Sequence, residues 1–168
     1  MVDIEYLRDS LDYNSSTGSL TWKRRDEMSK SWNTKFSGKL AFNTASSDGY
    51  KRGRINNKEY LAHRVAWAIY YGEWPSSDID HIDRNPSNNT ISNLRLATPS
   101  NNQWNKSKCK SNTSGYKGVT WSKDKKKWMA RCSAHGKEKF LGYFDDARSA
   151  SEAYCTYSKD KHGDYHCA

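Results

Sequence analysis

An acid and an imidazole stand side by side in a short apolar run, and this pair constrains the fold more than any other feature. Residues 79–83 read Ile-Asp-His-Ile-Asp, so isoleucines flank Asp80 and His81. Adjacent residues on a strand point to opposite faces, so the two cannot both be core residues unless one of them works from the surface of a site. A conflict of this kind is typical of a functional site.

The residues that follow predict a loop, a second strand and a helix. A turn-rich, Asn-rich loop over 83–89 leads to a second apolar run at 93–97. Thr98 can cap a helix, and Pro99 suits the first helical position because its missing N–H would be unsatisfied there anyway. Asn102 then lies about one turn into this helix.

This order of elements resembles the HNH nuclease family with its ββα-metal core, in the phage homing-endonuclease branch. The three positions of the family motif fall on His81, Asn93 and Asn102, and many members have a second His at the third position. The resemblance implies a metal-dependent, site-preferring DNA endonuclease with His81 as general base. It also implies that Asp80 and Asn102 bind the metal and that Asn93 orients His81 or the loop.

The chemistry of these side chains agrees with that resemblance. Phosphodiester hydrolysis needs an activated water, neutralisation of the phosphate charge and help for the leaving oxygen. A neutral imidazole can take the proton from water, because it titrates near the working pH. The oxygens of Asp80 and Asn102 suit Mg²⁺ or Mn²⁺ better than zinc, so we expect one divalent ion per site.

Two other kinds of metal site fit the sequence poorly. A calcium-binding loop would begin at Asp78, but Ile82 and Asn89 stand where such a loop needs an oxygen ligand and a bidentate Glu. The four cysteines include no Cys-x-x-Cys pair, so no structural zinc is expected and reduced thiols are the simpler interpretation. A further alternative, whose spacing fits no standard zinc pattern, would combine Cys155, His162, His166 and Cys167.

Charge and composition favour double-stranded DNA as the partner. The chain has 168 residues, a net charge of +9 and 13% aromatic residues, so basic groups are interleaved with flat apolar ones. Residues 1–15 are acidic and polar rather than a signal peptide, and no apolar run approaches the length of a membrane span. We therefore expect a soluble, cytoplasmic protein of a bacterial or phage-infected cell, neither secreted nor membrane-bound. With no heptad pattern, a monomer is expected.

Before the motif, the chain predicts short strands and one helix. A broad apolar face over 60–72 predicts the helix, which Gly72 can end, and residues 62–67 resemble the helix that precedes the metal motif in the homing-endonuclease branch. His63 lies near the start of this helix. It either packs as an ordinary histidine, or contacts a phosphate or a residue that binds the metal. Arg52 and Arg54 are expected to meet phosphate oxygens. The predicted strands cover residues 19–23, 39–42, 50–55 and 58–61.

A polar stretch without periodicity over 106–113 predicts a linker between two domains. The first domain would cover 1–105, with the ββα-metal motif at about 78–106, and the second 114–168. Alternating patterns in the second domain predict strands at 118–121, 127–132 and 139–144. A helix would follow, capped by Asp145 and running to about Tyr157.

The second domain resembles the plant APETALA/ERF DNA-binding domain over about residues 114–165. Tyr-Lys-Gly-Val, Trp-x-Ala-Arg, Leu-Gly-Tyr-Phe and Ala-x-x-Ala-Tyr recur in order, beginning at Tyr116. The resemblance implies that the sheet enters the major groove. The matching DNA-contact positions are Lys117, Thr120, Ser122 and Arg131, with Lys139 close by. Plant domains carry arginines where this chain has Thr120 and Ser122, so no target sequence follows.

The sequence thus predicts an α+β protein in which a β-rich segment and a helix lead into an HNH core, followed by a three-stranded antiparallel sheet packed on one helix. We expect a homing-type endonuclease that hydrolyses phosphodiester bonds and nicks one strand. The alternative is a DNA-binding or transcription-regulatory protein that carries a degenerate nuclease scaffold. The intact set of Asp80, His81, Asn93 and Asn102 favours the nuclease.

Overall fold

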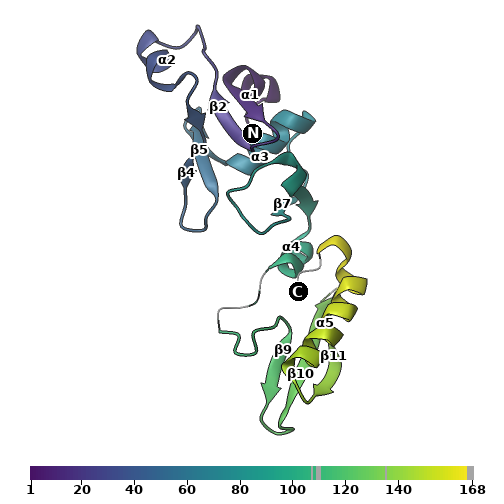
Figure 1. Cartoon of the computed structure of the whole chain (residues 1–168). Coiled ribbons are helices and arrows are strands. Elements are labelled where there is room, and N and C mark those ends of the chain that lie inside the picture. The colour runs from purple at the N-terminus through teal and green to yellow at the C-terminus, as the bar shows by residue number, and fades with distance from the viewer. Residues whose placement is uncertain (107, 109–110, 135, 166–168) are drawn as a thin grey trace. The chain divides into compact units, whose positions relative to one another are not determined.

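The computed structural model describes residues 1–106, 108, 111–134 and 136–165, and it confirms an α+β fold with small antiparallel sheets (Figure 1). The chain divides into two compact units, Met1–Ala97 and Thr98–Ala168. The helix that follows Thr98 therefore belongs to the second unit, whereas the sequence pattern groups it with the first domain. Among the described residues, no helix is both long and apolar enough to cross a membrane.

The N-terminal unit alternates short helices with sheets β1-β2-β3, β4-β5-β6 and β7-β8. Its elements are α1 (Ile4–Ser10), β1 (Leu11–Asn14), β2 (Ser19–Trp22), α2 (Lys30–Phe36), β3 (Leu40–Ala41), β4 (Thr44–Ala45), β5 (Lys51–Ile55), β6 (Lys58–Leu61), α3 (Ala62–Tyr71), β7 (Asp78–His81), the 3₁₀ turn η1 (Ile91–Asn93) and β8 (Leu94–Ala97). The strand predictions are confirmed in position, with ends that shift by a few residues.

Two helices in this unit were not predicted. Asp3 caps α1 by accepting from the backbone N–H of Ile4, and Ser29 caps α2 by accepting from that of Trp32. Each helix covers two turns, and α2 has no fully buried residue. An apolar period of 3.6 residues does not become visible over so short a stretch. The segment that the sequence presents as β-rich therefore also contains helices.

Helix α3 holds the N-terminal unit together because it packs into two apolar clusters. Ala62, Val65 and Ala68 join a cluster with the first two sheets, and Ala66 and Trp67 join Ile79 and Leu94 of the β7-β8 hairpin. Gly72 ends the helix in the left-handed conformation, with φ of 78°, as predicted. One helix thus fixes the hairpin that carries Asp80 and His81 against the rest of the unit.

A close backbone approach also fixes the loop between β7 and β8. Gly18, in the turn between β1 and β2, has φ of +70°, and a Cβ built on it would lie 2.4 Å from the carbonyl carbon of Asn89. Only glycine fits there without a shift of backbone. In addition, the Tyr13 hydroxyl donates to the Asn89 carbonyl at 2.7 Å. The N-terminal hairpin therefore supports the loop beside His81.

The C-terminal unit contains α4 (Pro99–Asn105), β9 (Val119–Ser122), β10 (Lys127–Ala134), β11 (Lys137–Phe144), α5 (Ala147–His162) and the 3₁₀ turn η2 (Gly163–Tyr165). Its strands form an antiparallel sheet in the order β11-β10-β9, and Val119 and Ala130 pack with Ala150 of α5. Gly118 is required by this packing, because a Cβ there would lie 2.2 Å from the Tyr154 ring. The predicted sheet on one helix is confirmed.

The predicted bounds of the last helix were wrong at both ends. Asp146 rather than Asp145 caps α5, since its side chain accepts from the backbone N–H of Ser149. Asp145 instead forms an ion pair with Lys127 at 2.9 Å. The helix continues past Tyr157 to His162 because its buried positions continue through Ser158 and His162.

Candidate active site

The β7-β8 hairpin places an ion pair at the centre of the candidate site. Asp80 lies opposite Arg95 in the register, and its Oδ2 accepts from Arg95 Nε at 2.8 Å, with Nη2 at 2.7 Å. Asp80 is only 8% exposed, and a carboxylate this buried needs a cationic partner. Arg95 was not singled out from the sequence, because the pairing depends on a register that the loop conceals.

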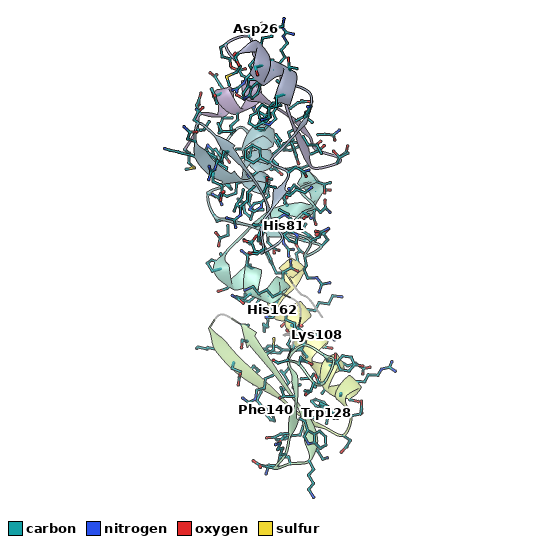
Figure 2. All side chains as sticks on the ribbon, turned by 90° about the vertical axis from the view of Figure 1, so that its left-hand side faces the viewer. Asp26, His81, Lys108, Trp128, Phe140 and His162 are labelled. Carbon is teal, nitrogen blue, oxygen red and sulfur yellow. The ribbon has the colours of Figure 1, made fainter. Side chains whose placement is uncertain are left out.

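His81, labelled in Figure 2, follows Asp80 at the end of β7 and is 4% exposed. Its Nε2 lies 3.0 Å from Oδ1 of Asn89. An amide oxygen only accepts hydrogen bonds, so Nε2 carries the proton and, in the neutral ring, Nδ1 carries the lone pair. Burial lowers the pKa of His81, and the hydrogen bond to Asn89 and the acids Asp83 and Asp80 act in the opposite direction. The ring is therefore neutral at pH 7.

Two further rings pack against this imidazole. His63 of α3 contacts His81 edge-on with centroids 5.1 Å apart, and Tyr50 lies 5.2 Å from His63 and 5.7 Å from His81. His63 is buried, and its Nδ1 has no hydrogen-bond partner among the described residues. Burial lowers the pKa of His63 to about 3, so this ring stays neutral beside His81. Tyr50 was not predicted as part of the site, because it lies far from the motif in the sequence.

Asn93 holds the loop between the two strands. Its Oδ1 accepts from the backbone N–H of Asp83 at 2.9 Å. Its Nδ2 donates to the Asp83 carboxylate at 2.9 Å and to the Asn88 carbonyl at 2.8 Å. Of the two roles suggested by the sequence, these contacts serve the loop. The same loop carries Asn89, whose Oδ1 contacts His81.

Asn102 lies on α4, whose N-terminus Thr98 caps as predicted by accepting from the backbone N–H of Asn101. Its Oδ1 is buried and has no hydrogen-bond partner among the described residues, so this amide oxygen is chemically suited to a hard cation. The Asp80 carboxylate is suited as well, although Arg95 already holds one of its oxygens. Within the described ranges, no group of three His, Cys, Asp or Glu side chains is arranged to hold a metal ion. A metal ion held by Asp80 and Asn102 would therefore need the amide oxygen of Asn102 as a ligand, and this metal role stays a proposal.

The two arginines predicted to contact DNA from the N-terminal unit differ in their surroundings. Arg52 forms ion pairs with Asp48 at 2.7 Å and with Glu59 at 3.2 Å. The Arg54 side chain is exposed and makes no hydrogen bond or ion pair to any described residue, although its backbone pairs with β6. Phosphate would have to compete with two carboxylates for Arg52, whereas Arg54 is available.

In the C-terminal unit, the predicted DNA-contact residues do not share one environment. The Lys117 ammonium donates to the carbonyls of Trp104 at 2.6 Å and Lys106 at 2.5 Å, so it also caps the end of α4. Lys139 lies opposite buried Cys132. Arg131 forms an exposed ion pair with Glu138.

The register places Thr120, Met129 and Tyr143 side by side across the sheet, and Arg131 opposite Phe140. Ser122 lies on the same face as Thr120, two residues along β9. Phe140 and Tyr143 are 48% and 41% exposed. Alternation along β11 would place these two residues, three apart, on opposite faces, and they share one face because the register shifts between Ala130 and Arg131.

The alternative metal group involves residues in part outside the described ranges. His166 and Cys167 lie outside them, as does Cys109. His162 is buried, where its Nε2 lies 3.0 Å from the Ser133 carbonyl and 3.7 Å from Cys132 Sγ, and its ring stacks on Trp104 with centroids 4.4 Å apart. Cys132 and Cys155 are free thiols.

The lowered pKa of His63 predicts a pH-dependent stability. In the unfolded chain the imidazole takes up a proton near pH 6.5, whereas in the folded unit it does so only near pH 3. The unfolded state therefore binds more protons between these values, and the free energy of unfolding should fall as the pH drops through this window. His63→Leu should flatten the profile by about 1.4 kcal/mol per pH unit in urea titrations. Parallel profiles for the parent and the variant would contradict the burial of a neutral His63.

Comparisons with known proteins agree with the motif. Residues 60–104 match the family model of an HNH endonuclease. Protein 3.8 of Escherichia phage T7 is 47% identical over 77 residues, which are 45% of this chain and 64% of that protein. An uncharacterized HNH endonuclease, L560, of Acanthamoeba polyphaga mimivirus is 48% identical over 72 residues, which are 42% of this chain and 36% of that protein. The chain thus spans less than two thirds of either relative.

A solved structure described as DNA binding and cleavage by the HNH homing endonuclease I-HmuI has 22% sequence identity and a TM-score of 0.45. The superposition covers 96% of this chain and 90% of that chain.

Proposed function

We propose that the chain is a metal-dependent DNA endonuclease, because residues 60–104 match an HNH endonuclease domain and hold a buried imidazole, His81, whose burial lowers its pKa. The single observation that carries the proposal is the buried contact between His81 Nε2 and Asn89 Oδ1. This contact selects the tautomer whose other nitrogen can accept a proton. The substrate proposed is double-stranded DNA, cut with a preference for a target site.

Each residue of the site has a proposed role. His81 takes a proton from water at Nδ1, and Asn89 keeps the ring in the required orientation. Asp80 and Asn102 would hold one Mg²⁺ or Mn²⁺ ion, which when bound neutralises charge on the phosphate and the leaving oxygen. Asn93 holds the loop through its hydrogen bonds, and the uncharged ring of His63 packs against His81.

DNA binding is proposed for both units. The net charge of +9 favours phosphate contacts, and Arg54 presents an exposed guanidinium in the N-terminal unit. The open sheet face of the C-terminal unit, with Thr120, Arg131 and Tyr143, resembles a surface that reads DNA. We propose an ERF-like mode for this face and an intracellular, monomeric enzyme of the homing type.

The first product is expected to be a nick. The chain carries one Asp-His…Asn…Asn set, and a monomer bound in one orientation presents this set to one strand. On a supercoiled plasmid that carries the target, relaxed circles should accumulate before linear DNA, and only with Mg²⁺ or Mn²⁺ present.

The same assay separates the alternatives. Linear DNA from the first time points, with a rate that rises as the square of enzyme concentration, would show that a dimer is the working form. DNA binding without any cleavage, across plasmids and both metals, would favour a DNA-binding or regulatory protein with a degenerate nuclease scaffold.

A further inference from the structure

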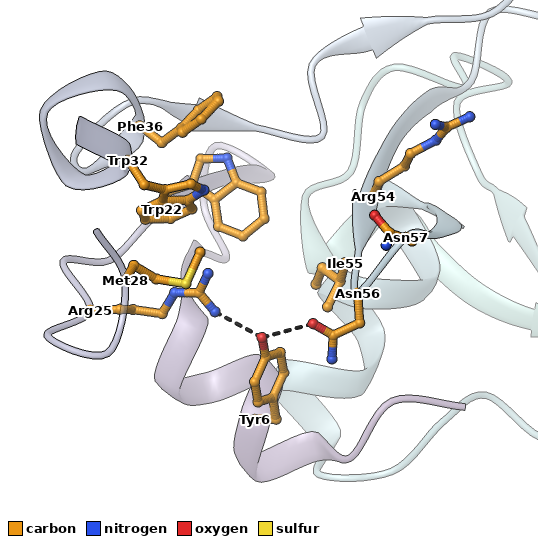
Figure 3. A pocket seen from close by; sticks show the side chains of 10 residues that line it. All are labelled: Tyr6, Trp22, Arg25, Met28, Trp32, Phe36, Arg54, Ile55, Asn56 and Asn57. Carbon is orange, nitrogen blue, oxygen red and sulfur yellow. Dashed lines mark hydrogen bonds between the residues drawn. The ribbon is translucent and has the colours of Figure 1, made fainter. Parts of the chain in front are cut away.

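A pocket with aromatic walls lies in the N-terminal unit, and none of its lining residues belongs to the nuclease motif (Figure 3). Its volume of about 470 Å³ falls within the range of roughly 300–1,000 Å³ that is usual for ligand sites. Figure 3 shows Trp22, Trp32 and Phe36 on one side and the turn between β5 and β6 on the other, with Arg25 and Tyr6 beneath.

The rings of the aromatic wall pack against one another and against Arg25. Trp32 contacts Trp22 edge-on with centroids 5.6 Å apart and Phe36 with centroids 5.2 Å apart. The Arg25 guanidinium lies over the Trp32 ring at 4.6 Å from its centroid. Rings fixed in this way offer a flat apolar surface that loses little side-chain entropy when a second ring packs on it.

Arg25 is buried with incomplete hydrogen bonding. It is 8% exposed, and its Nη1 donates to Tyr6 Oη at 3.0 Å and to Ser10 Oγ at 2.8 Å. Its Nε forms an ion pair with Glu27 at 3.6 Å and has no hydrogen-bond acceptor among the described residues. The buried guanidinium thus holds the floor of the pocket in place through Tyr6, Ser10 and the Trp32 ring.

The opposite wall is polar and cationic. Tyr6 Oη donates to Asn56 Oδ1 at 3.0 Å, which fixes this amide at the pocket. Asn57 follows in the same turn, and both residues adopt positive φ, of 50° and 62°. Arg54 lines the wall with an exposed guanidinium that has no partner among the described residues. None of the ten lining residues is acidic, whereas two are arginines.

We propose that this pocket receives one unpaired nucleobase of a DNA strand, with the base against the tryptophan wall and its phosphate on Arg54. This inference rests on the proposed function, because it assumes that DNA is the ligand. A nucleobase fits three features of the pocket: a flat aromatic face for stacking, the exposed amides of Asn56 and Asn57 for its polar edge, and the Arg54 guanidinium for its phosphate. An apolar protein side chain would use only the first of them.

The test compares two duplexes of the same sequence, one fully paired and one with a single bulged thymine, as ligands of the full chain. The parent should bind the bulged duplex more tightly. Trp32→Leu should lower the affinity for the bulged duplex by about tenfold and leave that for the paired duplex nearly unchanged. Arg54→Gln also removes a proposed phosphate contact, so it should lower both affinities, but that for the bulged duplex more, so that the preference for the bulge falls. Lys58→Gln is the matched control, because it removes one exposed positive charge from the same hairpin outside the pocket and should affect both duplexes equally.

If Trp32→Leu disturbs α2, Arg54→Gln still tests the proposal, because an exposed, unpaired side chain is not needed for folding. Equal affinity of the parent for the two duplexes, or an unchanged preference in Arg54→Gln, would overturn the pocket proposal. Plasmid nicking is measured in parallel with the parent and the same variants. If the parent cleaves the plasmid but does not prefer the bulged duplex, only the pocket proposal is rejected. If the parent prefers the bulged duplex but does not cleave, the proposed nuclease function is rejected.

Discussion

His81→Ala should lower the cleavage rate by about 10²- to 10⁴-fold, while the affinity for target DNA changes only a few-fold. In the proposed mechanism the imidazole accepts a proton from water, and because it is buried it should contribute little to binding of the DNA backbone. Single-turnover cleavage and a binding titration in Ca²⁺, which occupies oxygen sites, would measure the two effects separately.

A second substitution at this position separates chemistry from support of the loop. His81→Gln retains an N–H donor that can reach Asn89 Oδ1 but has no basic nitrogen. It should therefore unfold at the temperature of the parent and still be inactive. Substantial cleavage by His81→Gln would show that His81 is not the base, and loss of DNA binding in parallel with cleavage would assign it a structural role.

Asp80→Ala should also abolish cleavage, but because the divalent ion is lost. Raising the Mn²⁺ concentration should restore part of the activity, with a half-maximal concentration about tenfold or more above that of the parent. A metal titration of the nicking rate measures this shift. Identical titrations for the variant and the parent would contradict the assignment of Asp80 as a metal ligand.

The ion pair with Arg95 requires its own control, because Asp80→Ala leaves that guanidinium without the carboxylate. Arg95→Met breaks the same ion pair from the other side and keeps the stem of the side chain. It should lower the free energy of unfolding without raising the Mn²⁺ requirement. A raised requirement in Arg95→Met would mean that Arg95 positions the Asp80 carboxylate for the metal.

The elements around the site were predictable where a long pattern or a cap marks them. Helix α3 follows from apolar residues at helical spacing and from Gly72, and α4 follows from Thr98 and Pro99. Helices α1 and α2 could not be predicted in this way. Their stability comes from single caps at Asp3 and Ser29 and from packing, which a local pattern does not reveal.

The candidate site residues come from the motif and stay a prediction, whereas the contacts that support them could not be predicted. Asp80 and His81 were singled out because an acid and an imidazole conflict with an apolar strand. Arg95 and Asn89 escaped notice, because the strand register decides the first partner and the fold of an Asn-rich loop decides the second. Neither can be obtained from the spacing of residues.

The close approach of Gly18 to Asn89 has a consequence for how this site could be moved to another protein. The segment that matches the endonuclease family begins at residue 60, yet the loop beside His81 rests on backbone from the first hairpin and on the Tyr13 hydroxyl. A graft of residues 60–104 alone would leave Asn89 without this support, and the imidazole would lose its fixed tautomer. The portable unit therefore has to begin before Tyr13. An insertion that lengthens the Gly18 turn would displace Asn89 from His81, although it lies outside the matched segment.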